Sequence, residues 1–247
     1  MGSLAAIYRH PVKSLGEEAL SSVTLTTGQP LPWDRCWAIA HDRSDFNAVE
    51  PDWVKPQNFV IQSMCPELAQ IKCAFDEESG ALTMSHPVAG SVTSKPGKDD
   101  RLSAWIGPIA GASGPGPYRL ANVPGQALHD FPDTHISIGN LASLRALEEM
   151  AGRKLAHIRF RMNLWIDGFA PWEELDWADS EITIAATRLR VIDRVKRCNA
   201  TNADPETGTR NTDIPRLLHG RFGHMDFGLY AEVLNGGNVA VGHQASA

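Results

Sequence analysis

No stretch of the 247-residue sequence approaches the roughly 18 consecutive apolar residues that a membrane-spanning helix needs. The apolar run within Met1–Arg9 is also too short for the hydrophobic part of a secretory signal. We therefore expect a protein that makes no contact with a membrane and has a cytoplasmic location.

Cysteine is scarce, and the spacing of the four cysteines gives no Cys-x-x-Cys pair. A structural zinc site and a thioredoxin-type redox motif therefore have no support. Thiols in a chain without a recognisable secretory signal fit a reducing compartment such as the cytosol. The four cysteines are Cys36, Cys65, Cys73 and Cys198.

The motifs of several common enzyme classes are missing as well. The sequence contains no Gly-x-Ser-x-Gly, no Walker phosphate loop, no Gly-x-Gly-x-x-Gly and no His-Glu-x-x-His. Hydrolases with a nucleophile elbow, ATPases, Rossmann dehydrogenases and zinc hydrolases are therefore not indicated. The net charge of −6 argues against nucleic acid as a partner, because proteins that bind it usually carry a basic excess.

Short apolar or alternating segments recur along the chain, whereas helical periodicity is clear in few places. The clearest helix is predicted to begin after Asn140 and to end at Gly152. Shorter helices are expected near Asp99, ending at Gly107-Pro108, and after Asp213. This pattern predicts a mainly β fold with peripheral helices (α+β) around a β-barrel-like core. Strands are expected at residues 4–8, 20–26, 35–40, 59–61, 68–75, 81–85, 136–138, 160–166, 182–184, 189–195, 227–233 and 238–241.

A tract rich in glycine and proline begins at residue 111 and extends, as a flexible segment, to residue 133. Such tracts commonly separate domains. We predict a boundary within it that divides the chain into residues 1–122 and 123–247. The alternative is a plain surface loop within one continuous domain.

A cluster of basic residues precedes the last cysteine. Between residues 188 and 198, five basic side chains accompany one acid, Asp193, which reverses the overall charge locally. Neighbouring cations favour a thiolate, the form that attacks electrophiles and binds soft metals. A turn follows at residues 204–208. The segment predicts a reactive or metal-binding Cys198, and the alternative is a buried structural cysteine.

Other basic residues lie where an anion could bind. Lys13 and Ser14 follow a proline in a predicted loop, and a point charge beside a hydroxyl suits an oxyanion such as phosphate. Arg35 opens an apolar strand, where an unpaired charge is costly, so we expect an anionic partner; Asp34 is one candidate. Arg161 and Asn163 alternate with apolar residues and therefore share the opposite face of a predicted strand, which could simply be solvated.

These segments resemble, in the same order, the motifs of proteins that carry a MOSC domain after a MOSC N-terminal barrel domain. The resemblance covers nearly the whole chain. It implies a MOSC β-barrel together with a smaller N-terminal β-barrel-like domain. The segments that carry it are Ile7–Ser14, Asp34–Trp37, Phe160–Asn163, Arg197–Cys198, Asp204–Gly208, Phe227–Tyr230 and Val239–Gly242.

Within this family the chain resembles amidoxime-reducing proteins and their bacterial counterparts, which implies a molybdenum–molybdopterin cofactor. Cys198 would then be the metal ligand and, with Asp204 as a proton relay, the catalytic group. Asp204 could instead only shape its turn. The resemblance implies that Lys13, Ser14 and Arg35 hold the pterin phosphate and ring. It also implies that Arg161, Asn163 and Arg197 line the cofactor pocket.

The resemblance implies the reduction of small N-hydroxylated substrates such as amidoximes, hydroxylamines and N-hydroxylated bases. We expect the chain to lack the C-terminal iron–sulfur domain and the N-terminal membrane anchor that some members carry. We therefore expect a separate electron donor, which is a haem, flavin or iron–sulfur protein. Two alternatives remain open. One is a sulfur carrier that uses a Cys198 persulfide, and the other is a non-catalytic carrier of the cofactor.

Overall fold

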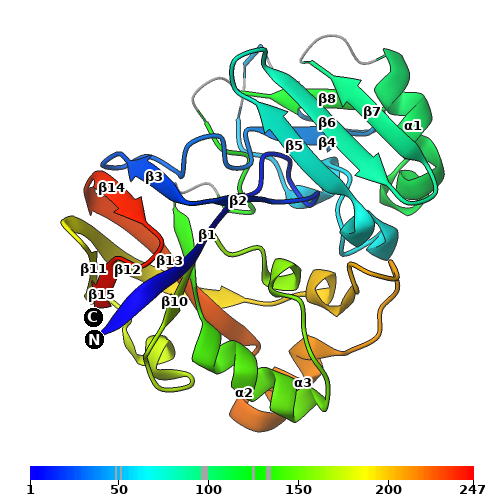
Figure 1. Ribbon diagram of the computed structural model, residues 1–247. Coiled ribbons are helices and arrows are strands. Elements are labelled where there is room, and N and C mark those ends of the chain that lie inside the picture. Colours follow the sequence, from blue (N-terminus) through cyan, green and yellow to red (C-terminus); the bar gives the residue numbers. More distant parts are fainter. Residues whose placement is uncertain (48, 51, 96–99, 124–125, 132–134) are drawn as a thin grey trace.

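Seven strands, among them the first strand of the chain, close into a β-barrel in the lower part of Figure 1. The computed structural model describes the chain apart from residues 48, 51, 96–99, 124–125 and 132–134. The hydrogen-bonded order is β10-β9-β13-β12-β11-β15-β1, and β1 pairs back onto β10. The strands are β1 (Gly2–Arg9), β9 (Ile136–Asn140), β10 (Leu164–Asp167), β11 (Glu181–Ile184), β12 (Thr187–Lys196), β13 (Asp226–Asn235) and β15 (Gln244–Ser246).

The barrel core consists of the alternating apolar side chains that the sequence pattern had indicated. Leu4, Ile138, Leu189 and Leu229 are all fully buried in one hydrophobic cluster inside it. Alternation with period two places one face of each strand inside and leaves the other for solvent or for the helices. The prediction of a mainly β fold with peripheral helices is confirmed.

Strand β1 lies between two strands from the far end of the sequence. Ser3 pairs with Asp167 of β10 on one side, and Gly2 pairs with Ala245 of β15 on the other. The N- and C-termini therefore lie side by side (Figure 1). Strand β2 (Glu18–Leu20) extends the sheet at β1, and β3 (Ser22–Leu25) pairs with β14 (Gly237–Ala240). The division at residue 122 stays a prediction, and part of the proposed boundary tract lies outside the described residues.

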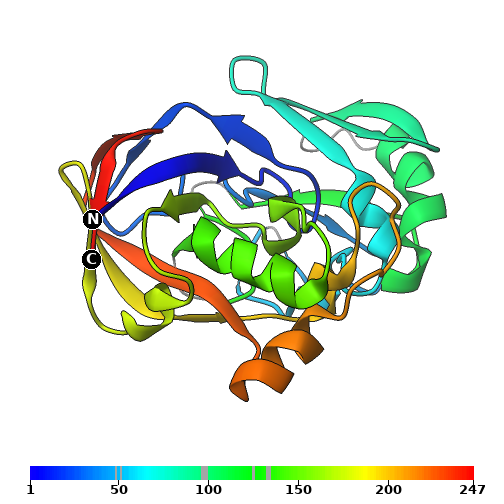
Figure 2. The same ribbon diagram turned by 60° about the horizontal axis from the view of Figure 1, so that its bottom comes forward.

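Two helices cover the outside of the barrel (Figure 2). Helix α2 (Leu141–Ala151) begins where the Asn140 side chain accepts a hydrogen bond from the amide of Ala142, and it ends at Gly152 in the left-handed conformation. Helix α3 (Ile214–Phe222) begins at Asp213, whose side chain accepts from the amide of Arg216. Apolar residues of both helices pack with Trp165 and Phe227 on the outer face of the sheet. Both predicted caps are confirmed.

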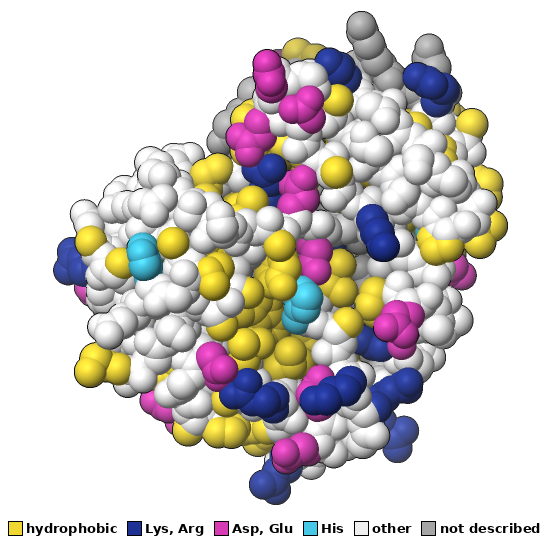
Figure 3. Space-filling model, viewed as in Figure 1, with side chains coloured by type: hydrophobic (Ala, Val, Ile, Leu, Met, Phe, Trp, Pro, Cys, Tyr) yellow, Lys and Arg dark blue, Asp and Glu magenta, His cyan; other side chains and the backbone are white. Residues whose placement is uncertain are grey.

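The upper part of Figure 1, the N-terminal lobe, contains two short sheets around a second core. Strands β5 (Lys72–Asp76), β6 (Ala81–His86) and β7 (Gly90–Ser94) form one antiparallel sheet. Strand β4 (Trp37–Ala40) pairs with β8 (Arg119–Asn122), and helix α1 (Asp100–Ala110) packs beside them. In space-filling form the two parts of the molecule appear as lobes with a notch between them at the upper left (Figure 3).

Several predicted elements differ from the structure for local reasons. Residues 59–61 make one isolated bridge rather than a strand, and Pro66–Gln70 form a 3-10 helix before β5 begins. Helix α1 continues through Pro108 to Ala110 instead of ending there, while its predicted start at Asp99 lies outside the described residues. None of the described helices has the length and apolar character that crossing a bilayer would require.

Candidate functional site

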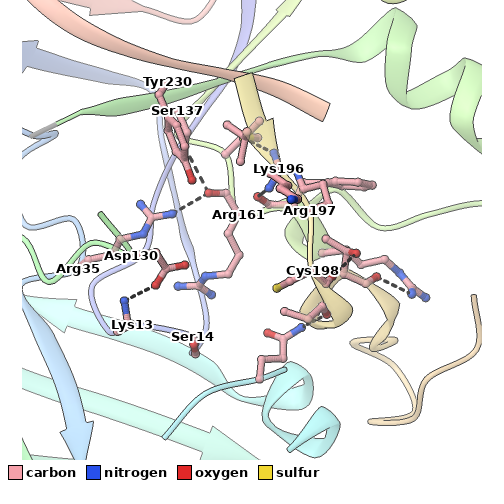
Figure 4. A pocket seen from close by; sticks show the side chains of 17 residues that line it. Lys13, Ser14, Arg35, Asp130, Ser137, Arg161, Lys196, Arg197, Cys198 and Tyr230 are labelled. Atoms are coloured by element: carbon pink, nitrogen blue, oxygen red, sulfur yellow. Dashed lines mark hydrogen bonds and ion pairs between the residues drawn. The ribbon is translucent and has the colours of Figure 1, made fainter. Parts of the chain in front are cut away.

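A cavity of about 120 Å³ lies where the barrel meets the N-terminal lobe, and most of the predicted site residues line it. In Figure 4, Lys13, Ser14 and Arg35 lie on one side, Arg197 and Cys198 lie on the other, and Arg161 reaches between them. The lining residues are Lys13, Ser14, Arg35, Gln62, Asp130, Ser137, Arg159, Phe160, Arg161, Met162, Val195, Lys196, Arg197, Cys198, Ala200, Thr201 and Tyr230.

The loop after β1 presents Lys13 and Ser14. The amide of Lys13 donates to the carbonyl of Trp37 at 2.8 Å, and the buried side chains of Val12 and Leu15 anchor the loop in the second core. Ser14 has a φ of 64°, so the chain turns sharply at this point. The buried Lys13 ammonium donates to the carbonyl of Leu128 at 3.0 Å and pairs with Asp130. Burial lowers the pKa of Lys13, although Asp130 opposes this.

Arg35 lies just before β4, and its buried partner is Asp34. Its guanidinium pairs with the Asp34 carboxylate and donates to the carbonyl of Arg161 at 2.8 Å. Asp34 also accepts from the amide of His10 at 2.7 Å. Burial acts to raise the pKa of Asp34, but Arg35 and the neighbouring histidines outweigh it, so that pKa lies well below its usual value. Asp34 is therefore ionised and compensates part of the charge of Arg35.

Arg161 connects the barrel side of the cavity to the Lys13 loop. The predicted strand at 160–166 begins only at Leu164, because His157–Phe160 form a 3-10 helix and Arg161 follows it with a φ of 50°. The Arg161 guanidinium donates to the carbonyls of Gly16 and Val12, both at 3.0 Å. Burial, together with the charge of Arg35, lowers the pKa of Arg161 to about 10. The cavity therefore holds this cation in an environment that favours an added negative charge.

Arg197 and Cys198 directly follow strand β12, which ends at Lys196. The buried Arg197 guanidinium donates to the carbonyls of Phe160 and Phe227, each at 2.9 Å. Burial lowers the pKa of Arg197 to about 10. Cys198 opens the 3-10 helix Asn199–Asn202, and its free thiol is exposed. The alternative of a buried structural cysteine is therefore wrong for Cys198.

The other three cysteines lie in less accessible surroundings. Cys65 and Cys73 are buried, and Cys36 is partly buried with its thiol directed at the carbonyls of Trp33 and Pro11. Burial raises the pKa of Cys73 to about 12 and raises that of Cys36 well above its usual value. Both groups remain protonated at neutral pH, so Cys198 is the thiol of this chain that is placed to meet a ligand.

Six basic side chains but a single carboxylate, Asp130, line the cavity. On the outer face in Figure 3, by contrast, basic and acidic side chains are interspersed. Positive charge gathered in a partly buried cleft attracts anions more strongly than the same charge spread over a surface. Among the described residues, no group of three or more His, Cys, Asp or Glu side chains could hold a metal ion.

Two of the predicted site residues do not line the cavity. Asn163 is buried behind it, where its side chain accepts from Ser137 and donates to the carbonyl of Tyr8 at 3.2 Å. Asp204 faces Arg159, with 3.0 Å between the guanidinium and the carboxylate. Asn163 therefore supports the ends of neighbouring strands, and Asp204 supports a residue of the cavity wall.

Sequence reasoning missed several residues of the wall, chiefly Asp130, Arg159, Ser137 and Tyr230. Asp130 and Ser137 lie in segments without a motif, and the pattern around Tyr230 indicates only a closing strand. Arg159 lies two residues before Arg161, and its proximity to a predicted site residue was the one available signal.

The chain matches two family models. Residues 1–105 match the MOSC N-terminal beta barrel domain, and residues 125–246 match the MOSC domain. Human molybdenum cofactor sulfurase is 33% identical over 92 residues, which cover 37% of this chain and 10% of that protein. Molybdenum cofactor sulfurase 2 of Culex quinquefasciatus is 24% identical in an alignment that is 271 residues long with its gaps and covers 92% of this chain and 34% of that protein.

This chain thus spans no more than about a third of the length of these two curated relatives. Among solved structures, the YuaD protein from Bacillus subtilis is similar with a TM-score of 0.46 and 11% sequence identity. That similarity covers 99% of this chain and 93% of the other.

Proposed function

Because this chain belongs to the family of MOSC-domain proteins with a MOSC N-terminal barrel domain, we propose that it binds a molybdenum–molybdopterin cofactor and reduces N-hydroxylated compounds. The observation that carries the proposal is the cavity itself, which combines six cations with one exposed thiol. A pterin phosphate is an oxyanion, and molybdenum accepts soft thiolate ligands. The donor set therefore fits this group.

Each wall of the cavity has its own task in this proposal. Lys13, Ser14 and Arg35 would hold the phosphate and the pterin ring. Arg161 and Arg197, which are fixed by carbonyl groups of both lobes, would lie along the cofactor. Cys198 would ligate the metal. Because these arginines are already held in place before a ligand arrives, binding costs little side-chain ordering.

When bound, the cofactor would supply the electron-transfer chemistry, in which an N–O bond breaks and two electrons and two protons convert the oxygen to water. This chain's residues would orient the cofactor and balance its charge. A separate haem, flavin or iron–sulfur protein would supply the electrons. The product is then the corresponding amidine, amine or base.

The exposed thiol and the names of the curated relatives favour a second candidate, a sulfur carrier that uses a Cys198 persulfide. A persulfide, however, requires no set of phosphate-binding cations. A third candidate, a cofactor carrier without turnover, uses the same cavity as the reductase. Metal content, sulfur content and turnover separate the three.

The proposal predicts about one molybdenum per chain after expression in a molybdenum-replete host, as expected for a single thiolate site. Cys198→Ala should lose the metal, because the cavity then has no thiolate. Cys36→Ala is the matched control and should keep it, since this thiol lies outside the cavity. Metal analysis with cofactor extraction measures both. Full molybdenum in Cys198→Ala would overturn the assignment of the ligand.

Turnover decides between the reductase and the carrier. The loaded protein should reduce an amidoxime with reduced viologen as electron donor but should show no reduction with NADH alone. Bound cofactor without turnover, across several N-hydroxylated substrates and donors, would leave the carrier. Cyanide-releasable sulfur on Cys198 without molybdenum would point to sulfur transfer instead.

A further inference from the structure

A buried ion pair lies directly behind the turn that carries Cys198. The Arg159 side chain is almost fully buried, and its guanidinium lies 3.0 Å from the Asp204 carboxylate. The same guanidinium donates to the carbonyls of Asn202 at 3.1 Å and Thr201 at 3.4 Å. Thr201 in turn donates from its hydroxyl to the carbonyl of Cys198 at 2.9 Å. A continuous chain of polar contacts therefore connects Asp204 to the backbone of Cys198.

Asp204 is itself held firmly. Its carboxylate accepts from the amide of Glu206 at 2.8 Å and from the side chain of Asn211, and its carbonyl accepts from the amide of Gly208 at 2.8 Å. Gly208 has a φ of 68°, which favours glycine and closes the turn. The Asp204 side chain keeps only 14% of its exposure. It is thus the fixed end of the contact chain.

Asp204 is poorly suited to pass protons to a ligand. It does not line the cavity, and Arg159 stands between it and the Cys198 turn. Burial acts to raise the pKa of Asp204, but the hydrogen bond from Glu206 and the charge of Arg159 outweigh it, so that pKa is lowered. The carboxylate stays ionised at neutral pH.

We propose that Asp204 and Arg159 act as a clamp that holds the turn after β12, so that the Cys198 thiol faces the cationic cavity. Asp204 is then a positioning residue rather than a proton relay. One nitrogen of the Arg159 guanidinium donates to both carbonyls of the turn and the other faces Asp204, and a lysine would not reproduce this planar fork. The importance of Cys198 as a metal ligand rests on the proposed function, but the clamp can be tested without any cofactor.

The test compares two alkylating reagents at Cys198 in the protein without cofactor. Iodoacetate is anionic and iodoacetamide is neutral, so the ratio of their rates reports the positive potential at the thiol. Both reagents react with the thiolate, so the thiolate fraction cancels in the ratio. Mass spectrometry of the peptide that contains Cys198 measures each rate at low ionic strength, where the cavity charges are least screened.

The clamp and plain electrostatics predict different signs for Asp204→Asn. Removal of a negative charge would by itself raise the positive potential and therefore the rate ratio. If the clamp holds the turn, its loss lets Cys198 leave the cavity, and the ratio falls. We expect a fall of about threefold or more, since charged clefts raise encounter rates with opposite charges by roughly 10- to 1000-fold. Arg159→Met and Arg159→Lys should also lower the ratio.

Asp167→Asn is the matched control, because Asp167 forms a 2.7 Å ion pair with Arg145 on the outside of the barrel. It should leave the ratio unchanged. Circular dichroism and urea unfolding verify that each variant is folded, and Asp204→Asn decides the matter if Arg159→Met does not fold. An unchanged or increased ratio in folded Asp204→Asn would overturn the clamp. If the rate ratio falls in Asp204→Asn but the wild-type protein binds no molybdenum, the clamp is supported and the proposed function is contradicted.

Discussion

Three residues of the cavity wall adopt a backbone conformation that their side chains disfavour. Ser14, Arg35 and Arg161 have φ values of 64°, 50° and 50°. Each such residue costs about 1–2 kcal/mol relative to the right-handed region. Hydrogen bonds to other segments offset this cost, such as the one from the amide of Arg35 to the carbonyl of His10 at 2.7 Å. Strain of this kind gathers at sites where side-chain direction matters more than local stability.

At the same scale, Asp130 is predicted to weaken anion binding. It pairs with Lys13, the cation best placed for phosphate, and it is the single carboxylate of the lining. Asp130→Asn should raise the affinity for inorganic phosphate by about fivefold, which corresponds to roughly 1 kcal/mol for a partly exposed pair. Isothermal calorimetry at low ionic strength measures this, with Asp167→Asn as the control. An affinity equal to that of the wild-type protein would show that Asp130 does not compete.

At the scale of elements, a buried carboxyl group connects the start of helix α2 to the segment that follows β10. Glu174 is fully buried in the 3-10 helix Glu173–Asp176. One of its carboxyl oxygens accepts from Asn140, the residue that caps α2, and from Ser143, at 2.9 and 2.8 Å. Its other oxygen has no hydrogen-bond partner among the described residues. Burial raises the pKa of Glu174, and the two hydrogen bonds oppose this only in part.

This arrangement predicts a dependence of stability on pH. The pKa of Glu174 is raised in the folded state. Its contribution to the free energy of unfolding is therefore fully present below the pKa of the unfolded chain, near 4.5, and is lost as the pH rises through the pKa of the folded state. As the pH falls from neutral towards the pKa of the unfolded chain, the free energy of unfolding of the wild-type protein should therefore rise relative to that of Glu174→Gln. Urea unfolding of both proteins at several pH values measures the difference. Parallel curves would contradict the assignment.

At the scale of the whole molecule, the barrel depends on both ends of the chain. Leu4 and Ile7 of β1 are 0% and 1% exposed within a core otherwise built mostly by residues after 135. Without β1, the edges of β10 and β15 would be unpaired, and open edges favour aggregation. The cavity likewise takes one wall from the N-terminal lobe and the other from the barrel.

A fragment of residues 123–247 is accordingly predicted not to fold, whereas the same fragment followed by a short Gly/Ser linker and residues 1–31 should fold. The linker can be short because Gly2 pairs with Ala245. Gel filtration, together with the presence or absence of a cooperative thermal transition, distinguishes the two. A cooperative transition in the shorter fragment would show that β1 is dispensable to the barrel.

The sequence by itself determined the local features and the chemical character of the site. The caps of α2 and α3 follow from Asn140, Gly152 and Asp213, because capping involves residues only a few positions apart. Alternation with period two indicated most barrel strands, because it too depends on residues that are close in the sequence. The basic residues and Cys198 were also recognisable from residue type and motif alone.

Only the tertiary structure decided which of these residues meet. Lys13 and Arg161 are separated by 148 positions in the sequence, yet they line one cavity because β1 pairs with β10. The partnership of Asp130 with Lys13, the clamp of Asp204 on Arg159 and the left-handed turns at Ser14 and Arg35 depend on contacts between distant segments. Such contacts leave no periodic pattern in the sequence, because they are selected by packing and charge in the folded chain.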